Sequence, residues 1–160
     1  MVYIITGVSG VGKTTIGLIM AKELNLPFYD ADDFHPSSNT HKMKNGIPLN
    51  DEDRQPWLAI LADRIKVWNK EGGAVLACSA LKEKYRQTLQ VIDQSEIRFI
   101  FLHADASLIF ERLQKRKGHY MDSGLLDSQF EALEQPNYGI HVQVNKSPDL
   151  VLKEIIDQIT

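Results

Sequence analysis

The segment GVSGVGKT, residues 7–14, carries the residue types that proteins use to hold phosphate groups. It satisfies the pattern G-x-x-x-x-G-K-[ST], in which glycines let successive backbone N–H groups point at phosphate oxygens. Lys13 should reach the β- and γ-phosphates of ATP, and the Thr14 hydroxyl should bind Mg²⁺. The alternative is a glycine-rich turn with an exposed lysine. The predicted nucleotide-binding residues here are Gly7, Ser9, Gly10, Val11, Gly12, Lys13, Thr14 and Thr15.

A second segment, YDADDFHP at residues 29–36, brings three carboxylates together at the end of an apolar run. We expect it to lie beside the phosphate-binding loop, at the carboxyl edge of a parallel sheet. Asp32 is then predicted to meet an acceptor hydroxyl, as a general base or a positioning group. Asp30 is predicted to order water bound to Mg²⁺, and Asp33 to cap the turn. Capping of the turn by all three acids is the alternative.

The elements that must position these residues follow from the spacing of apolar residues. Short apolar runs alternate with amphipathic segments, so we predict an α/β fold with a mostly parallel five-stranded sheet and helices on both faces. The predicted strands are VYIIT, LPFYD, AVLAC, IRFIFL and IHVQV. The predicted helices are residues 14–24, 56–69, 81–89, 106–116 and 148–159. Residues 31–50 and 117–124 break the pattern and are expected to carry function.

Composition sets further bounds. With 160 residues, of which 43% are hydrophobic, the chain should form one domain. A net charge of −3 gives no reason to expect nucleic acid or a membrane surface as a partner. Cys78 is the one cysteine, which excludes an internal disulfide and a thiolate metal cluster, and we expect it to pack as a small buried residue. No signal peptide or membrane span is recognisable, so we predict a cytoplasmic location.

Several segments together resemble the gluconate kinase family, which is similar to shikimate and nucleoside monophosphate kinases. The resemblance covers almost the whole chain and rests on residues 29–58, CSALKEKYR, RLQKRKGHYM and SQFEALEQP. It implies a three-layer phosphate-loop (P-loop) NTPase fold in one kinase domain, residues 1–160, with an acceptor-binding segment at 31–56 and a mobile lid at 112–124. It also implies ATP-dependent phosphorylation of D-gluconate at its 6-hydroxyl, and a homodimer.

Gluconate is an anion with several hydroxyls, so its site needs a cation and hydrogen-bonding groups. Arg54 is the leading cation, because a guanidinium binds a carboxylate through two hydrogen bonds. An ion pair of Arg54 with Asp51 or Glu52 is the alternative. Weaker candidates for binding gluconate are His35, Lys42, Lys82 and Arg86, with Lys82 and Arg86 one helical turn apart.

The predicted lid carries further cations. Arg112 and Arg116 share a helix face and could close over the phosphates of ATP, where Arg116 would act in catalysis together with Lys13 and Asp32. His119 could bind gluconate or pack within the lid. The family pattern places adenine near residues 145–148.

AVLAC is not followed by an aspartate that could bind a metal, so Mg²⁺ is expected to be held by Thr14, phosphate oxygens and water, with Asp30 nearby. Two other functions stay open. One is a kinase for another small hydroxylated acceptor, such as shikimate or a nucleotide. The other is an ATP-binding module without turnover, which the presence of Lys13, Thr14 and Asp32 argues against.

Overall fold

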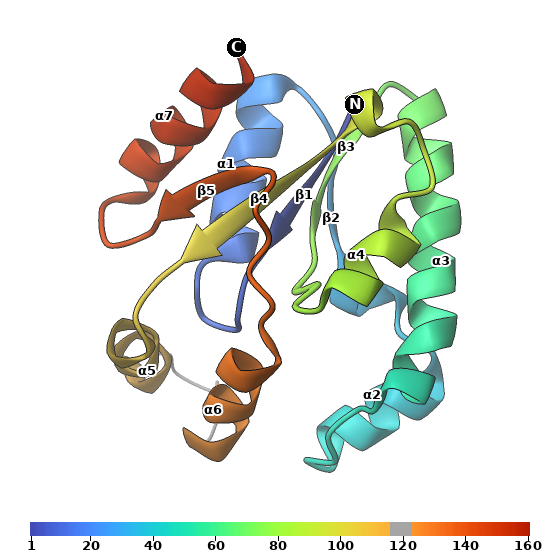
Figure 1. The fold of residues 1–160 in the computed structure, drawn as a ribbon, viewed down its shortest axis with the longest axis vertical. Coiled ribbons are helices and arrows are strands. Elements are labelled where there is room, and N and C mark those ends of the chain that lie inside the picture. Colours follow the sequence, from blue (N-terminus) through green and yellow to red (C-terminus); the bar gives the residue numbers. More distant parts are fainter. Residues whose placement is uncertain (116–122) are drawn as a thin grey trace.

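The structure, a computed structural model, describes residues 1–115 and 123–160. Within the described chain, five strands form one sheet in the order β2-β3-β1-β4-β5, and all neighbouring strands are parallel (Figure 1). The strands are β1 Val2–Thr6, β2 Phe28–Asp30, β3 Ala74–Ala77, β4 Ile97–His103 and β5 Ile140–Gln143. The predicted α/β fold with a five-stranded parallel sheet is confirmed.

Helices cover both faces of this sheet, as predicted (Figure 1). On one face lie α1 (Lys13–Leu24) and α7 (Pro148–Ile159), and on the other lie α3 (Asp51–Lys70) and α4 (Glu83–Leu89). Beyond the carboxyl ends of the strands lie α2 (Ser37–Lys44), α5 (Ala106–Lys115) and α6 (Ser123–Ala132). The short 3-10 helices are η1 (Ala31–Phe34), directly after β2, and η2 (Gln94–Glu96), directly before β4.

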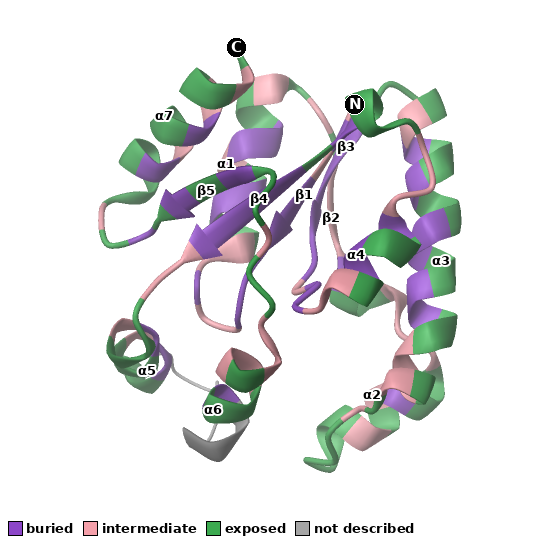
Figure 2. Ribbon diagram, in the orientation of Figure 1, coloured by how far each residue is buried: buried purple, intermediate pink, exposed green. Residues whose placement is uncertain are grey.

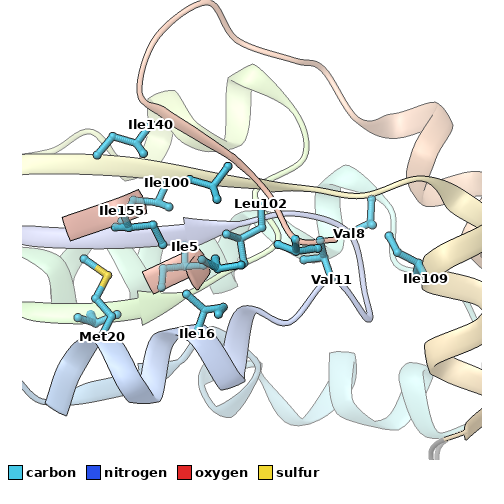
Figure 3. Close-up of a cluster of buried hydrophobic side chains, with 14 of the residues drawn as sticks. Ile5, Val8, Val11, Ile16, Met20, Ile100, Leu102, Ile109, Ile140 and Ile155 are labelled. Atoms are coloured by element: carbon cyan, nitrogen blue, oxygen red, sulfur yellow. The ribbon is translucent and has the colours of Figure 1, made fainter. Parts of the chain in front are cut away.

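Two hydrophobic cores lie between the sheet and its helices, one on each face of the sheet. Figure 3 shows the core beneath α1 and α7, where Ile5 and Ile100 from the strands meet Ile16 and Ile155 from the helices. The other core lies beneath α3 and α4. Figure 2 shows β1, β3 and β4 mostly buried and β2 partly buried, and it shows α1, α3 and α7 buried on the side that faces the sheet. Because both faces are covered, the strands read as continuous apolar runs in the sequence.

The segment between β2 and α3 is more regular than predicted. Residues 31–50 contain η1 and α2, and α3 begins at Asp51 instead of Pro56. A capping box accounts for the earlier start: the Asn50 side chain accepts a hydrogen bond from the Asp53 amide at 2.8 Å, and the Asp53 carboxylate accepts one from the Asn50 amide at 3.0 Å. This cap places the first turn of α3, with Arg54, beside the end of β2.

The strand order corrects one detail of the prediction. Strand β3 lies between β1 and β2, so the end of β2 is not next to the strand that precedes the P-loop. Small residues follow the end of β3, at Cys78 and Ser79, and the Ser79 carbonyl accepts a hydrogen bond from the Gly7 amide at 3.4 Å. The P-loop and the end of β2 can therefore approach each other across β3.

Candidate active site

The P-loop, residues 7–14, joins β1 to α1. Gly7 adopts a φ of 147°, and a Cβ atom there would lie 2.9 Å from the Leu102 carbonyl oxygen, so only glycine fits this position. Gly12 is the N-cap of α1, and no side chain caps the helix there. The first amide groups of α1 are therefore available to an anion, and the helix dipole favours negative charge at this end. The loop has the geometry of a phosphate site.

Two side chains hold the P-loop in its present form. Lys13 Nζ donates to the carbonyls of Gly7 at 2.9 Å and of Val8 at 3.1 Å. Gln129, on α6, accepts a hydrogen bond from the Ser9 amide at 2.7 Å and donates one to the Ser9 hydroxyl at 2.9 Å. Gln129 thus links α6 to the P-loop. The sequence analysis missed this residue, because only the SQFEALEQP resemblance marked its segment.

The acids after β2 lie at the P-loop. The Thr14 hydroxyl donates to the Asp30 carboxylate at 3.4 Å, and Asp30 also accepts a hydrogen bond from the Asp32 amide at 3.0 Å. Partial burial raises the pKa of Asp30. Asp30, and not Asp33 as predicted, therefore caps the turn into η1, because its carboxylate lies one residue before that turn begins. The neighbouring His35 lowers the pKa of Asp32, which keeps Asp32 ionised.

A cavity of about 680 Å³ brings the predicted groups together. Its walls come from the P-loop, from the segment after β2, from the first turns of α3, from the loop after β3 and from α6. The predicted site residues that line it are Ser9, Gly10, Gly12, Lys13, Thr14, Asp30, Asp32, His35, Arg54 and Lys82. Phosphate-binding groups, carboxylates and cations thus share one space.

Arg54 and Lys82 both line this cavity, and both lie near the ring of Tyr85. The Arg54 guanidinium lies 5.5 Å from the centre of the Tyr85 ring and donates to the Tyr85 hydroxyl at 3.3 Å. Lys82 Nζ lies 5.8 Å from the same ring and 3.7 Å from the Asp51 carboxylate. Asp51 pairs with Lys82 and Lys84, so the alternative of an ion pair between Arg54 and Asp51 does not describe this structure.

Two predicted gluconate ligands lie elsewhere. Lys42 does not line the cavity: its Nζ atom lies 2.9 Å from both oxygens of Asp53 and stabilises the capped end of α3. Arg86 does not line the cavity either: its side chain is only 2% exposed. It donates to the backbone carbonyls of Ala80 and Glu134, each at 2.7 Å. Arg86 therefore stabilises the loop after β3 by joining it to the segment that follows α6.

A smaller cavity, of about 270 Å³, lies on the other side of the P-loop. It is lined by Gly10, Val11, Gly12, Thr15, Arg112, Lys146 and Pro148, among others. Arg112 donates to the Val144 carbonyl at 2.7 Å, so it is tied to the loop that follows β5. This cavity lies where the sequence analysis expected adenine, near residues 145–148. Arg116 and His119, with most of the predicted lid, lie outside the described residues.

Cys78 directly follows β3 and lines the larger cavity. Its residue surface is only 2% exposed, and burial raises the pKa of its thiol to about 12. A thiol with so high a pKa does not form the thiolate that nucleophilic chemistry requires. Cys78 is a packing residue, as the sequence predicted.

Comparison with known proteins identifies the family. A family model described as shikimate kinase matches residues 9–160. The chain is 43% identical to a probable gluconokinase from Xenopus tropicalis, over 99% of this chain and 93% of that protein. It is also 43% identical to a gluconokinase from Gluconobacter oxydans, over 96% of this chain and 88% of that protein. This chain belongs to the gluconokinase family.

Solved structures agree with this assignment. A crystal structure of a gluconokinase from Sinorhizobium meliloti superposes with a TM-score of 0.88 at 37% identity, over 97% of this chain and 89% of that chain. A shikimate kinase from Aquifex aeolicus has a TM-score of 0.65 at 20% identity, over 99% of this chain and 96% of that one, which shows a shared P-loop kinase fold. No helix in the described part of this gluconokinase-family chain is long and apolar enough to cross a membrane.

Proposed function

We propose that this chain transfers the γ-phosphoryl group of ATP to the 6-hydroxyl of D-gluconate and forms ADP and 6-phospho-D-gluconate. The observation that carries the proposal is the shared cavity, which joins Lys13 of the P-loop to the Asp32 carboxylate and the Arg54 guanidinium. This reaction needs a phosphate site, a group that accepts the hydroxyl proton and a cation for the sugar carboxylate. The relatives' names point to the same acceptor.

The nucleotide would lie across both cavities, because Gly10 and Gly12 line each of them. Adenine would occupy the smaller cavity beside Lys146 and Pro148, and the phosphates would follow the P-loop into the larger one. Lys13 Nζ, which lies at the loop carbonyls, needs only side-chain rotation to meet the phosphates.

A hydroxyl at the start of α1 and a carboxylate at the end of β2 would fit a Mg²⁺ ion that is held mainly by phosphate and water. Thr14 and Asp30 supply oxygen atoms, the ligand type that Mg²⁺ prefers. Bound Mg²⁺ would offset negative charge on the transferring phosphate.

Gluconate carries its charge at one end and the reacting hydroxyl at the other. The cavity offers cations for the charged end and a carboxylate for the hydroxyl. Arg54 and Lys82 gather around Tyr85, where they would bind the carboxylate. Asp32 lies beside the P-loop residues, where the 6-hydroxyl must meet the γ-phosphate.

In the transfer step, the oxygen of the 6-hydroxyl forms a bond to the γ-phosphorus while the bond between that phosphorus and the β-γ bridging oxygen breaks. ADP leaves with the electrons of that bond, and the hydroxyl proton passes to Asp32. The low pKa of Asp32 keeps it ionised and able to accept the hydrogen bond that orients the hydroxyl. The P-loop amides and Lys13 would hold the phosphates in line.

The experiment is an ADP-release assay on the purified protein, with D-gluconate, shikimate and nucleoside monophosphates offered separately. We expect ADP with gluconate, whereas turnover only with another acceptor would contradict the substrate. Asp32→Asn should lower kcat by roughly 10²–10⁴-fold and leave the affinity for ATP nearly unchanged. Asp33→Asn is the matched control, since Asp33 does not line the cavity, and it should turn over normally. Normal turnover by Asp32→Asn would remove Asp32 from the mechanism.

The homodimer, implied by the family resemblance, and the cytoplasmic location, expected because no signal peptide or membrane span was recognisable, stay predictions. Light scattering on the purified protein and fractionation of cells would test them.

A further inference from the structure

His35 was predicted to bind gluconate, but its contacts indicate a different task. Its side chain is only 4% exposed, and its ring stacks on Trp57 with centroids 4.2 Å apart and planes 15° apart. Trp57 is itself held, because its indole N–H donates to the Ala31 carbonyl at 2.7 Å. The ring of His35 is therefore fixed, and its Nε2 atom lies 3.7 Å from Asp32 Oδ1.

The other ring nitrogen, Nδ1, meets the buried amide of Asn39 on α2. Asn39 is 2% exposed, and its Nδ2 atom lies 2.7 Å from the Asp53 backbone carbonyl oxygen. A carbonyl oxygen can only accept, so the side-chain atom that faces it must be the amide nitrogen. The same nitrogen lies 3.2 Å from His35 Nδ1. Its two hydrogens therefore point at Asp53 and at His35.

This arrangement determines where His35 carries its proton. Because Asn39 donates to Nδ1, that nitrogen must be the acceptor of the neutral ring, and the ring proton must be on Nε2. The Nε2–H group faces Asp32. If the proton were on Nδ1, the His35 Nδ1–H group and the Asn39 N–H group would face each other, and neither would have an acceptor. Asp53 therefore determines the tautomer of His35 through Asn39, although Asp53 does not itself contact the His35 ring.

We propose that His35 is a positioning residue for phosphoryl transfer: its Nε2–H group donates to Asp32 Oδ1 and turns Asp32 Oδ2 toward the acceptor hydroxyl. This rests on the role of Asp32 in the proposed function. The Asp32 side chain is 79% exposed, so without a partner it would sample many orientations. The separation of 3.7 Å is longer than a hydrogen bond, and the exposed carboxylate can rotate to shorten it when the acceptor binds.

The same network connects the two ends of the acceptor site. Asn39 joins His35 to the Asp53 carbonyl in the first turn of α3, and the next residue of that turn is Arg54. Lys42, also on α2, binds the carboxylate of the same Asp53. Helix α2 therefore sets the position of the carboxylate that meets the hydroxyl relative to the cation proposed for the sugar carboxylate.

Nuclear magnetic resonance tests the tautomer directly. The nitrogen chemical shifts of the His35 ring, measured in ¹⁵N-labelled protein at a pH where the ring is neutral, should show a protonated Nε2 and an unprotonated Nδ1. A ring protonated on Nδ1 would overturn the proposal. This measurement needs no turnover, so it is independent of the identity of the acceptor.

Kinetics of two variants test the consequence. His35→Phe keeps a flat ring against Trp57 but has no donor, and we expect kcat to fall about 10- to 100-fold, the range for losing a hydrogen bond to a charged group, with the KM for ATP unchanged. His35→Gln places an amide donor near the position of Nε2 and should restore kcat to within about fivefold of the wild type. His41→Phe, on the exposed side of α2, is the matched control and should leave kcat unchanged.

The outcomes separate this proposal from the function on which it rests. An unchanged kcat in His35→Phe, or a rise in the KM for gluconate with kcat unchanged, would overturn the positioning role. Absence of turnover by the wild type with every acceptor would instead overturn the proposed function, and with it the task assigned to His35.

Discussion

Arg86 joins the loop after β3 to the segment that follows α6, and replacing it with methionine tests how much stability this link provides. Methionine fills much of the same volume but donates no hydrogen bonds. The carbonyl oxygens of Ala80 and Glu134 would lose the donor that they have in the described structure. The Leu81 carbonyl would keep its bond from the Glu134 amide at 2.8 Å, so it should contribute little.

The expected cost follows from these contacts. Leaving the buried Ala80 carbonyl without a donor costs about 1–3 kcal/mol, whereas Glu134 is exposed, so water can replace the donor that its carbonyl loses. The side chain of the ion-pair partner Glu83 is 41% exposed, so its carboxylate stays hydrated without Arg86 and adds little to the loss. For a chain of this size the melting temperature should fall by at least about 2 °C.

Urea denaturation followed by circular dichroism measures this free energy of unfolding. Arg86→Lys should fall between the wild type and Arg86→Met, since a lysine can reach only some of the acceptors. Lys153→Met is the control: it breaks an exposed pair with Asp157 on α7 and should change the stability by less than about 0.5 kcal/mol. If Arg86→Met lost less than about 1 kcal/mol, the buried role assigned to Arg86 would be refuted.

Two further predictions concern the larger cavity. The Cys78 thiol, with its pKa raised to about 12 by burial, should react with Ellman's reagent at neutral pH only after the protein is unfolded, and rapid reaction of the native protein would contradict its burial. Arg54→Met should raise the KM for gluconate about 10- to 100-fold with little change in the KM for ATP. Lys84→Met, which removes a cation that pairs with Asp51 outside the cavity, should leave both constants near the wild type, and equal effects of the two variants would refute the specific role of Arg54.

Much of the fold could be predicted because its signals are local. The strands lie within a few residues of their predicted bounds, since buried parallel strands read as apolar runs. Helix α7 has its predicted bounds, because Ser147 caps its start and Pro148 suits its first turn. The start of α3 was misplaced because its cap depends on a reciprocal pair, Asn50 and Asp53, and not on the apolar pattern.

The sequence alone determined the phosphate site and the family. A P-loop is defined by residues that are consecutive in the chain, so its geometry follows from glycine backbone freedom at Gly7, Gly10 and Gly12. The D-x-D acids follow directly after a strand, so the edge of the sheet at which they lie was also predictable. The tasks of Asp30 and Asp33 were not, because the cap of the 3-10 turn depends on the orientation of one side chain.

Only the tertiary structure decided which polar side chains face the cavity. The sequence ranked Arg54 above Arg86 as a carboxylate ligand but left both open, and Arg86 is enclosed by Glu134 and Tyr138, about fifty residues farther along the chain. Gln129 reaches Ser9, and Asn39 reaches His35 and Asp53, through contacts that no local pattern encodes. Hydrogen-bond partners are chosen by the packing of distant elements, and for that reason the cavity side chains and the tautomer of His35 could be read only from the folded chain.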